Sequence, residues 1–286
     1  MPQREIPIIT LPWPEAKLPS YRTGSVGPWS IERTPAVNNA AGYFLIAKKQ
    51  PPGWVIKHNG KSIWMSLTKM EVESHLPHLA AAKGHVVIAG LGMGFALYNI
   101  QANPNVTKIT LIEKNPDIPK LLDMSTNWKD WPGGEKTTIV LHDALTYKST
   151  EKVDFLYADI WPHLGDWNAL YNTQIMQKNI QAKQVGYWGQ EWDYVSYCQH
   201  NKADPCTISY RKFCRESSLP LIEQNNTAYP HLSFAAVILQ IATSDKSKCR
   251  TSLFKKYSRY LLHSLIGDKI DAEIRSNLLQ QALYEE

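Results

Sequence analysis

The segment HVVIAGLGMGFAL, residues 85–97, constrains the fold of this chain more than any other stretch. Its first half is a continuous apolar run, which is typical of a strand covered on both faces of a parallel sheet. Gly90, Gly92 and Gly94 then occupy alternate positions before a helix-like stretch. A turn that needs positive φ explains one such glycine, but three of them after a buried strand favour a loop whose bare backbone contacts a cofactor.

Strand-like and helix-like segments alternate after this loop. Because buried strands separated by helices are joined by crossovers, this order predicts an α/β fold with a doubly wound, mostly parallel sheet. Further strands are expected at 108–115, 137–144, 152–160 and 184–189, and helices at 95–103, 117–128 and 168–180.

Three regions are predicted along the chain. Residues 1–67 are expected to form an irregular arm and a small β-rich N-terminal element, residues 68–202 the ligand-binding domain, and residues 203–286 a mainly helical C-terminal extension. The clearest amphipathic segment of that extension is 269–286.

Local signals support the first two regions. The arm reaches to about residue 40 and is expected to pack through Trp13 and Trp29. Asn-Gly at 59–60 predicts a hairpin turn in the β-rich element. A helix is expected over 68–84, with Thr68 as its cap and Glu71 three residues further on.

Composition excludes several classes of protein. No apolar run approaches the roughly 18 residues that span a bilayer, and the proline-broken N-terminus lacks an apolar signal-peptide core, so we expect a cytoplasmic protein without a membrane partner. The net charge of +5 permits an anionic partner without requiring one. The four cysteines form no C-x-x-C pair, so no metal site is predicted. The oligomeric state stays open, a homo-oligomer included.

Polar residues follow the predicted strands at the edge where the glycine loop should lie. Glu113 and Lys114 end the second strand, Asp143 and Ala144 the third, and Asp159 the fourth. Because the carboxyl ends of parallel strands share one edge, these residues are expected beside the loop. There Glu113 can accept the hydroxyls of a ribose, and Asp143 can accept an adenine amino group.

Two common nucleotide-binding patterns do not fit the loop. A dinucleotide loop needs Gly or Ala at the last position of G-x-G-x-x-G, which here is Phe95 or Leu97. A bulky side chain at that position would push the helix off the sheet. No Lys-Ser or Lys-Thr pair follows the glycines, so a Walker loop is excluded as well.

The order of these parts resembles the class I S-adenosylmethionine-dependent methyltransferases over about residues 68–190. VESHLPHLAAAKGHVVIAGLGMG and ITLIEKNPDI are similar to the spermidine synthase-like branch of that superfamily. GLGMG with DIWP also looks like methyltransferase-like proteins of bacteriophages. The resemblance implies a Rossmann-like methyltransferase fold and S-adenosyl-L-methionine as the cofactor.

The resemblance also implies roles for the site residues. The loop from Gly90 to Gly94, Leu91 included, would lie against the methionine moiety and the ribose. Glu113, with Lys114 beside it, would bind the ribose hydroxyls. Asp143 and Ala144 would contact the adenine, and Asp159 would face the sulfonium.

Two departures from the pattern leave alternatives open. Many methyltransferases carry an acidic residue where Ile88 stands, although spermidine synthases share an apolar residue there. Those synthases place a second aspartate shortly after the one at the fourth strand, whereas this chain has Ile160, Trp161 and Pro162. Methyl transfer to an unidentified acceptor is therefore the leading hypothesis. Aminopropyl transfer from decarboxylated S-adenosylmethionine and non-catalytic binding of an adenosyl ligand are the alternatives.

The acceptor side of the site is less specific. Asp159 and His163 are the candidate catalytic bases, Trp161 and Pro162 a flat apolar wall for the substrate, and Trp188 a roof over the pocket. DIWP contains the ingredients of an amino-methyltransferase motif that stacks a flipped base, but in another order. A small molecule and a nucleic acid both remain as candidate acceptors.

Overall fold

The structure is a computed structural model that describes residues 13–36, 40–41, 46–47, 51–203 and 207–222 of the 286-residue chain. The predicted amphipathic segment 269–286 lies outside these residues, as do Cys206 and Cys249. Cys198 and Cys214, which are described, are buried.

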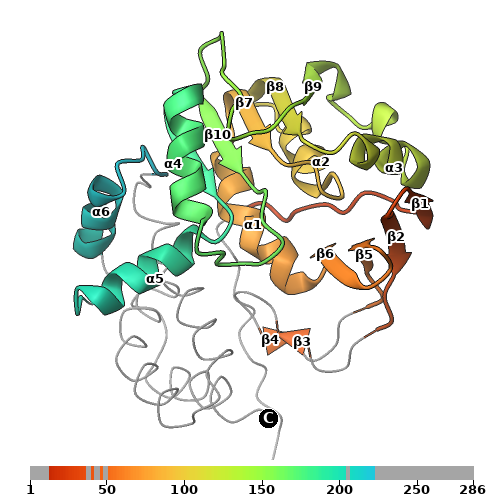
Figure 1. The fold of residues 1–286 in the computed structure, drawn as a ribbon, viewed down its shortest axis with the longest axis horizontal. Helices are drawn as coiled ribbons and strands as arrows, with labels where there is room; N and C mark the ends of the chain where they lie inside the picture. Colours follow the sequence, from red (N-terminus) through yellow and green to blue (C-terminus); the bar gives the residue numbers. More distant parts are fainter. Residues whose placement is uncertain (1–12, 37–39, 42–45, 48–50, 204–206, 223–286) are drawn as a thin grey trace, which may run out of the picture.

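A five-stranded parallel sheet forms the centre of the described chain (Figure 1). Its strands are β7 (Gly84–Ala89), β8 (Val106–Glu113), β9 (Thr137–Leu141), β10 (Phe155–Ala158) and β11 (Gln184–Tyr187). Their order is β11-β10-β7-β8-β9, and every neighbouring pair is parallel. The strand order therefore reverses beside β7, which is where ligands bind in doubly wound folds. The predicted fold class is confirmed.

Helices cover both faces of this sheet. One face packs against α1 (Lys69–Ala81), α2 (Phe95–Gln101) and α3 (Asp117–Ser125). The other face packs against α4 (Ala169–Ile180), α5 (Gln190–His200) and α6 (Thr207–Glu216). Along β7, Val86 and Ile88 enter the first core while Val87 and Ala89 enter the second, because side chains alternate across a strand. The continuous apolar run of β7 follows from this burial on both faces.

A separate antiparallel sheet precedes the parallel one. It has the order β1-β2-β5-β6 and consists of β1 (Gly24–Val26), β2 (Trp29–Arg33), β5 (Trp54–His58) and β6 (Ser62–Ser66). The Asn59-Gly60 turn joins β5 and β6 with positive φ at both residues, as the sequence predicts. The hairpin of β1 and β2 lies in the part expected to be irregular, so that expectation is wrong there. Its signal was the Gly27-Pro28 turn, with Gly27 at φ 54°.

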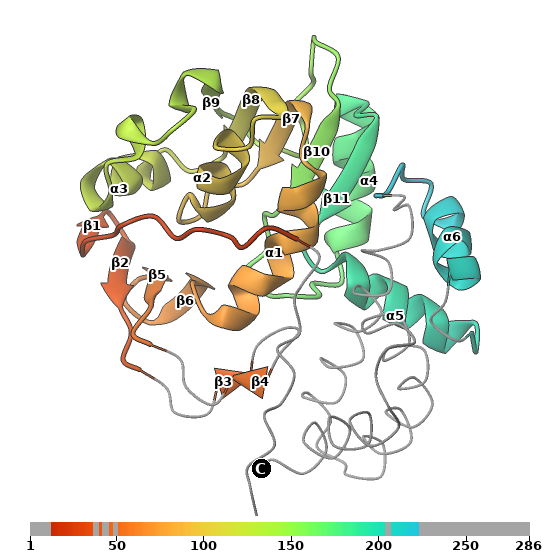
Figure 2. The same ribbon diagram turned by 180° about the vertical axis from the view of Figure 1, so that it is seen from behind.

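Shorter elements complete the description. They are β3 (Ala40–Ala41), β4 (Ile46–Ala47) and two 3-10 helices, Trp128–Asp130 and Gly134–Lys136. Figure 2 shows the segment before β1 crossing α2. Lys17 donates its backbone N–H to the Asn99 side chain, and the Tyr21 hydroxyl donates to the carbonyl of Met93, so this arm is fixed by hydrogen bonds. Trp13 and Trp29 are both buried, which confirms them as anchors.

Helix α1 begins as predicted but uses Glu71 differently. The Thr68 hydroxyl accepts the backbone N–H of Glu71, which confirms the cap. In a capping box the Glu71 carboxylate would bond back to the Thr68 N–H. Instead it accepts the backbone N–H of Ser66 at 2.9 Å and the Ser66 hydroxyl. Glu71 therefore ties α1 to the end of β6.

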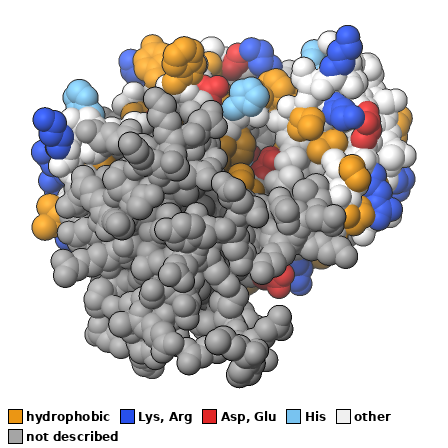
Figure 3. Space-filling model, turned by 90° about the horizontal axis from the view of Figure 1, so that it is seen from below, with side chains coloured by type: hydrophobic (Ala, Val, Ile, Leu, Met, Phe, Trp, Pro, Cys, Tyr) orange, Lys and Arg blue, Asp and Glu red, His pale blue; other side chains and the backbone are white. Residues whose placement is uncertain are grey.

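The surface of the described residues shows no concentrated positive charge on the face seen in Figure 3. Blue Lys and Arg side chains are scattered around the margin of that face and do not gather in one patch. Within the described ranges, no helix has the length and hydropathy to cross a membrane.

Candidate functional site

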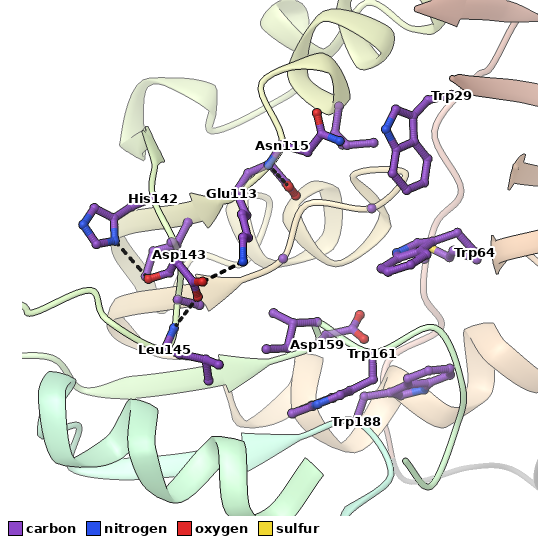
Figure 4. A pocket seen from close by; sticks show the side chains of 18 of the residues that line it. Trp29, Trp64, Glu113, Asn115, His142, Asp143, Leu145, Asp159, Trp161 and Trp188 are labelled. Atoms are coloured by element: carbon purple, nitrogen blue, oxygen red, sulfur yellow. Dashed lines mark hydrogen bonds and ion pairs between the residues drawn. The ribbon is translucent and has the colours of Figure 1, made fainter. Parts of the chain in front are cut away.

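A cavity of about 610 Å³ lies at the carboxyl edge of the parallel sheet. Figure 4 shows side chains from both sheets directed toward it. The described residues that line it come from the ends of β7, β8, β9 and β10, from the chain after β11, from α1, and from the antiparallel sheet. It is therefore the crevice expected at a reversal of strand order.

The glycine loop forms the middle of the cavity wall. Gly90 has φ 98° and Gly92 has φ 51°, a region that residues with a Cβ rarely adopt. A Cβ on Gly90 would lie 2.1 Å from the carbonyl oxygen of Asp159, so the glycine also lets β7 and β10 approach. A Cβ on Gly92 would lie 2.7 Å from the Met65 sulfur. Gly94 has a different position, because it is the N-cap of α2 and faces Trp131.

Glu113 is fixed against the glycine loop. One carboxylate oxygen accepts the Leu91 N–H at 3.0 Å, and the other accepts the Asn115 N–H at 2.7 Å. Each oxygen of a carboxylate has a second lone pair, so these bonds orient the group and leave acceptor capacity. Since Glu113 lines the cavity, that capacity is available to the hydroxyls of a ligand.

Asp143 continues the same wall from the end of β9. Its carboxylate accepts from the Lys114 ammonium at 2.7 Å and from the Leu145 N–H at 3.0 Å. These two donors, Lys114 first, hold the pKa of Asp143 below its usual range, so it is ionised at neutral pH. Lys114 and Ala144 line the cavity with it.

The chemistry of this part of the cavity suits a flat ring joined to hydroxyl groups. Ile112, Ala144 and Leu145 line it with apolar surface, and Glu113 lines it with carboxylate acceptors. Within the described ranges, no group of three His, Cys, Asp or Glu residues is placed to hold a metal ion.

Two further carboxyl groups, Asp159 and Glu71, line the cavity beyond the glycine loop. Burial raises the pKa of Asp159 to about 8, and the charge of Glu71 adds to the rise. Burial also raises the pKa of Glu71 to about 7, against the opposing effect of its bonds to Ser66. Raised pKa values of this kind are frequent in catalytic acids and bases.

The buried side chain of His75 lies next to Asp159. His75 of α1 lies with Nδ1 4.0 Å from an Asp159 oxygen and shares a hydrogen bond with the Tyr157 hydroxyl. Burial, followed by the effect of His78, lowers the pKa of His75 to about 3, so its ring is neutral. The ring stacks on Trp188 at 5.8 Å and 6°, and the Trp188 N–H donates to the Ser74 hydroxyl at 2.8 Å. These contacts position Trp188 at the cavity wall.

The structure gathers most of the predicted site residues. Those that line the cavity are Gly90, Gly92, Glu113, Lys114, Asp143, Ala144, Asp159, Trp161 and Trp188. Leu91, Gly94 and Pro162 lie near it in sequence but do not line it. His163 is exposed to solvent and also lies outside the lining.

Sequence reasoning missed the residues that come from outside the strand ends. They are Trp29, Trp64 and Met65 of the antiparallel sheet, Glu71 of α1 and Ile118 of α3. Glu71 was read only through its spacing from Thr68. No local pattern in the sequence indicated that its carboxylate would line the cavity.

Comparisons with known proteins find structural similarity over only part of the chain. No protein-family model matches the chain, and no curated protein sequence matches it. Among solved structures, similarity is found to the 23S rRNA methyltransferase ErmE, with 19% identity, a TM-score of 0.25, and 30% of this chain and 34% of that one covered.

Two further solved structures have similar values. The CcbJ methyltransferase of Streptomyces caelestis has 16% identity and a TM-score of 0.29, with 38% of this chain and 46% of that one covered. A complex of DhpI with SAM has 13% identity and a TM-score of 0.29, with 38% and 48% covered. The aligned region thus spans less than half of each structure. TM-scores of this size assign no family to the chain.

Proposed function

We propose that this chain is a methyltransferase-like enzyme that binds S-adenosylmethionine at the carboxyl edge of its parallel sheet. One observation carries the proposal: Glu113 is bonded to the glycine loop and still offers acceptor capacity to the cavity. A carboxylate at the end of the second strand, beside a bare loop, suits the two hydroxyls of a ribose.

Each part of the wall has a role in this proposal. Glu113 holds the ribose, and the ionised Asp143 accepts the adenine amino group while Ala144 contacts the ring. Gly90 and Gly92 leave room for the methionine moiety along the loop. When bound, S-adenosylmethionine supplies a methyl group activated by the sulfonium. Asp159 lies at the far side of the loop, where it orients the acceptor and takes its proton.

Calorimetric titration with S-adenosylhomocysteine tests this proposal. We expect Glu113→Gln to weaken binding about thirtyfold, which is on the order of 2 kcal/mol for lost charged hydrogen bonds. Glu135→Gln is the matched control, because Glu135 lies in the 3-10 helix Gly134–Lys136, away from the cavity lining. Absence of binding by the wild-type protein would contradict the proposal.

Product analysis separates the candidate reactions. Methyl transfer from S-adenosylmethionine releases S-adenosylhomocysteine, whereas aminopropyl transfer from the decarboxylated form releases methylthioadenosine. Binding without either product over a broad acceptor panel would favour a non-catalytic adenosyl-binding protein.

A further inference from the structure

The cavity has two chemically different ends. Glu113 and Asp143 lie toward one end, and tryptophan rings with Asp159 lie toward the other (Figure 4). In that figure the Asp159 carboxylate is directed toward the space between the rings of Trp64 and Trp188. We name this second part, lined by Trp29, Trp64, Glu71, Asp159 and Trp188, the acidic end of the cavity.

Two carboxyl groups at the acidic end, Glu71 and Asp159, have no counter-charge among the described residues that line the cavity. Among the described lining residues, Lys114 is the one lysine, and it is ion-paired with Asp143 at 2.7 Å. His75, whose Nδ1 lies 4.0 Å from an Asp159 oxygen, is neutral because burial lowers its pKa. Glu71 is close enough to Asp159 to raise the pKa of that carboxyl. The Glu71 carboxylate is bonded to Ser66, two residues after Trp64, so both carboxyl groups border the same end of the cavity. Two carboxylates that share one partly enclosed cavity repel each other, and a proton or a cation between them relieves that repulsion.

The aromatic walls point to the same kind of ligand. The face of an indole ring attracts a cation within about 6 Å, and the attraction grows where water is excluded. Trp29 and Trp188 are 8% and 7% exposed, whereas Trp64 at 39% borders the opening. Trp29 packs edge-on against Trp64 with the ring centroids 5.5 Å apart, so the wall is preassembled.

We propose that the acidic end is the acceptor subsite and that it takes an amine. The acceptor would carry one ammonium group on an apolar or aromatic body. Glu71 and Asp159 would hold the ammonium group, and Trp64 and Trp188 would flank it. This inference rests on the proposed function, because it names the molecule that meets the adenosyl ligand.

A single ammonium fits better than a polyamine. Among the described lining residues, the other two acids are Glu113 and Asp143. Glu113 accepts two backbone N–H groups, and Asp143 is paired with Lys114. A second ammonium would therefore meet tryptophan rings without a carboxylate, and burying an unpaired charge is unfavourable.

Asp159 can also prepare the amine for reaction. The bound ammonium transfers one proton to the Asp159 carboxylate, which gives a neutral amine and a carboxylic acid. The freed lone pair on nitrogen then faces the glycine loop, and the proton later leaves to water. Glu71 keeps its negative charge through this transfer and attracts the positive product.

Calorimetry on protein saturated with S-adenosylhomocysteine tests the inference. Phenethylamine and 2-phenylethanol differ only in the group that meets the two carboxylates, and putrescine carries a second ammonium. We expect phenethylamine to bind at least about tenfold more tightly than either of the others. Repeating the titration in phosphate and in Tris measures protons released, and we expect release at pH 7 as the carboxyl groups ionise around the cation.

Glu71→Gln is the discriminating variant, because glutamine keeps an oxygen to accept from Ser66. We expect this substitution to weaken the binding of phenethylamine about tenfold and to leave the binding of 2-phenylethanol unchanged. Glu151→Gln, on the exposed Lys108 ion pair, should change neither. Equal binding of amine and alcohol, or an unaltered amine affinity in Glu71→Gln, would overturn the amine assignment and leave the proposed function standing. Failure of S-adenosylhomocysteine to bind would overturn both.

Discussion

Gly90 is the residue whose geometry the site depends on most directly. Alanine at this position would need φ 98° and would place its Cβ 2.1 Å from the Asp159 carbonyl oxygen. We expect Gly90→Ala to lower the free energy of unfolding by more than about 3 kcal/mol, because backbone must move. Urea denaturation measures the change.

Gly60→Ala separates the effect of the positive φ from the effect of the steric clash. Gly60 has φ 64°, but nothing lies within 4 Å of its missing Cβ, so alanine suffers only the backbone penalty. We expect a loss of about 1 kcal/mol. Similar losses for the two variants would show that the close approach of β7 and β10 is not what requires Gly90.

Asp159 should make stability depend on pH in a defined direction. The folded protein holds the Asp159 proton up to about pH 8, whereas an aspartate in the unfolded chain loses it near pH 4. Between these values the folded state binds more protons, so stability falls as pH rises. Glu71, His75 and Tyr157 are the titratable groups that face Asp159, and the last two stay neutral in this range.

Asp159→Asn removes this dependence. From pH 5 to pH 8 we expect its stability relative to wild type to increase by on the order of 1 kcal/mol or more. Asp143→Asn is the control. Because the pKa of Asp143 is lowered in the folded protein, this residue is ionised over this range in both the folded and the unfolded chain. A parallel pH profile for wild type and Asp159→Asn would show that Asp159 is not held protonated.

At the residue scale, sequence predicted the strand-end acids but not their partners. Glu113, Asp143 and Asp159 follow apolar strands, so their common edge could be deduced. Glu71 reaches the cavity through the packing of α1 against β6, which no local spacing encodes. His163 was chosen for its chemistry alone, and the structure exposes it to solvent.

At the element scale, α1 positions the cavity wall through one buried hydrogen bond. Ser74 is 2% exposed and accepts the Trp188 N–H at 2.8 Å. Ser74→Ala leaves that N–H unpaired, and we expect a loss of about 1–3 kcal/mol in urea denaturation. Ser149→Ala, which removes two exposed hydrogen bonds with the Glu151 backbone, should cost under about 0.5 kcal/mol. Equal losses of stability in Ser74→Ala and Ser149→Ala would mean that the buried Ser74–Trp188 hydrogen bond contributes no more than a surface hydrogen bond.

The elements themselves were predictable where periodicity was strong. All five parallel strands were expected, because β-prone runs recur between helix-like segments. The signal was strongest for β7 and β10, which are buried on both faces, whereas β9 at the edge is partly exposed. The β1–β2 hairpin was missed, since three- and five-residue strands in a proline-rich stretch give little pattern. The missed hairpin contributes Trp29 to the cavity lining, while β6 of the same sheet contributes Trp64 and Met65.

At the scale of the whole molecule, two sheets share one cavity. The parallel sheet contributes the strand-end acids and the glycine loop, and the antiparallel sheet covers the opposite side. The contact is direct, because the Met65 sulfur accepts the Met93 N–H at 3.4 Å. The end of the cavity with Glu113 and Asp143 therefore belongs to the doubly wound fold, while the acidic end is formed jointly with α1 and the N-terminal strands.

A crystal structure of the full chain with S-adenosylhomocysteine tests the central claim most directly. We predict that the ribose hydroxyls lie within hydrogen-bond distance of Glu113, with the adenine beside Asp143 and Ala144 and the sulfur near Gly90 and Asp159. A ligand bound elsewhere, or a cavity that stays filled by protein at saturating ligand, would contradict the adenosyl assignment.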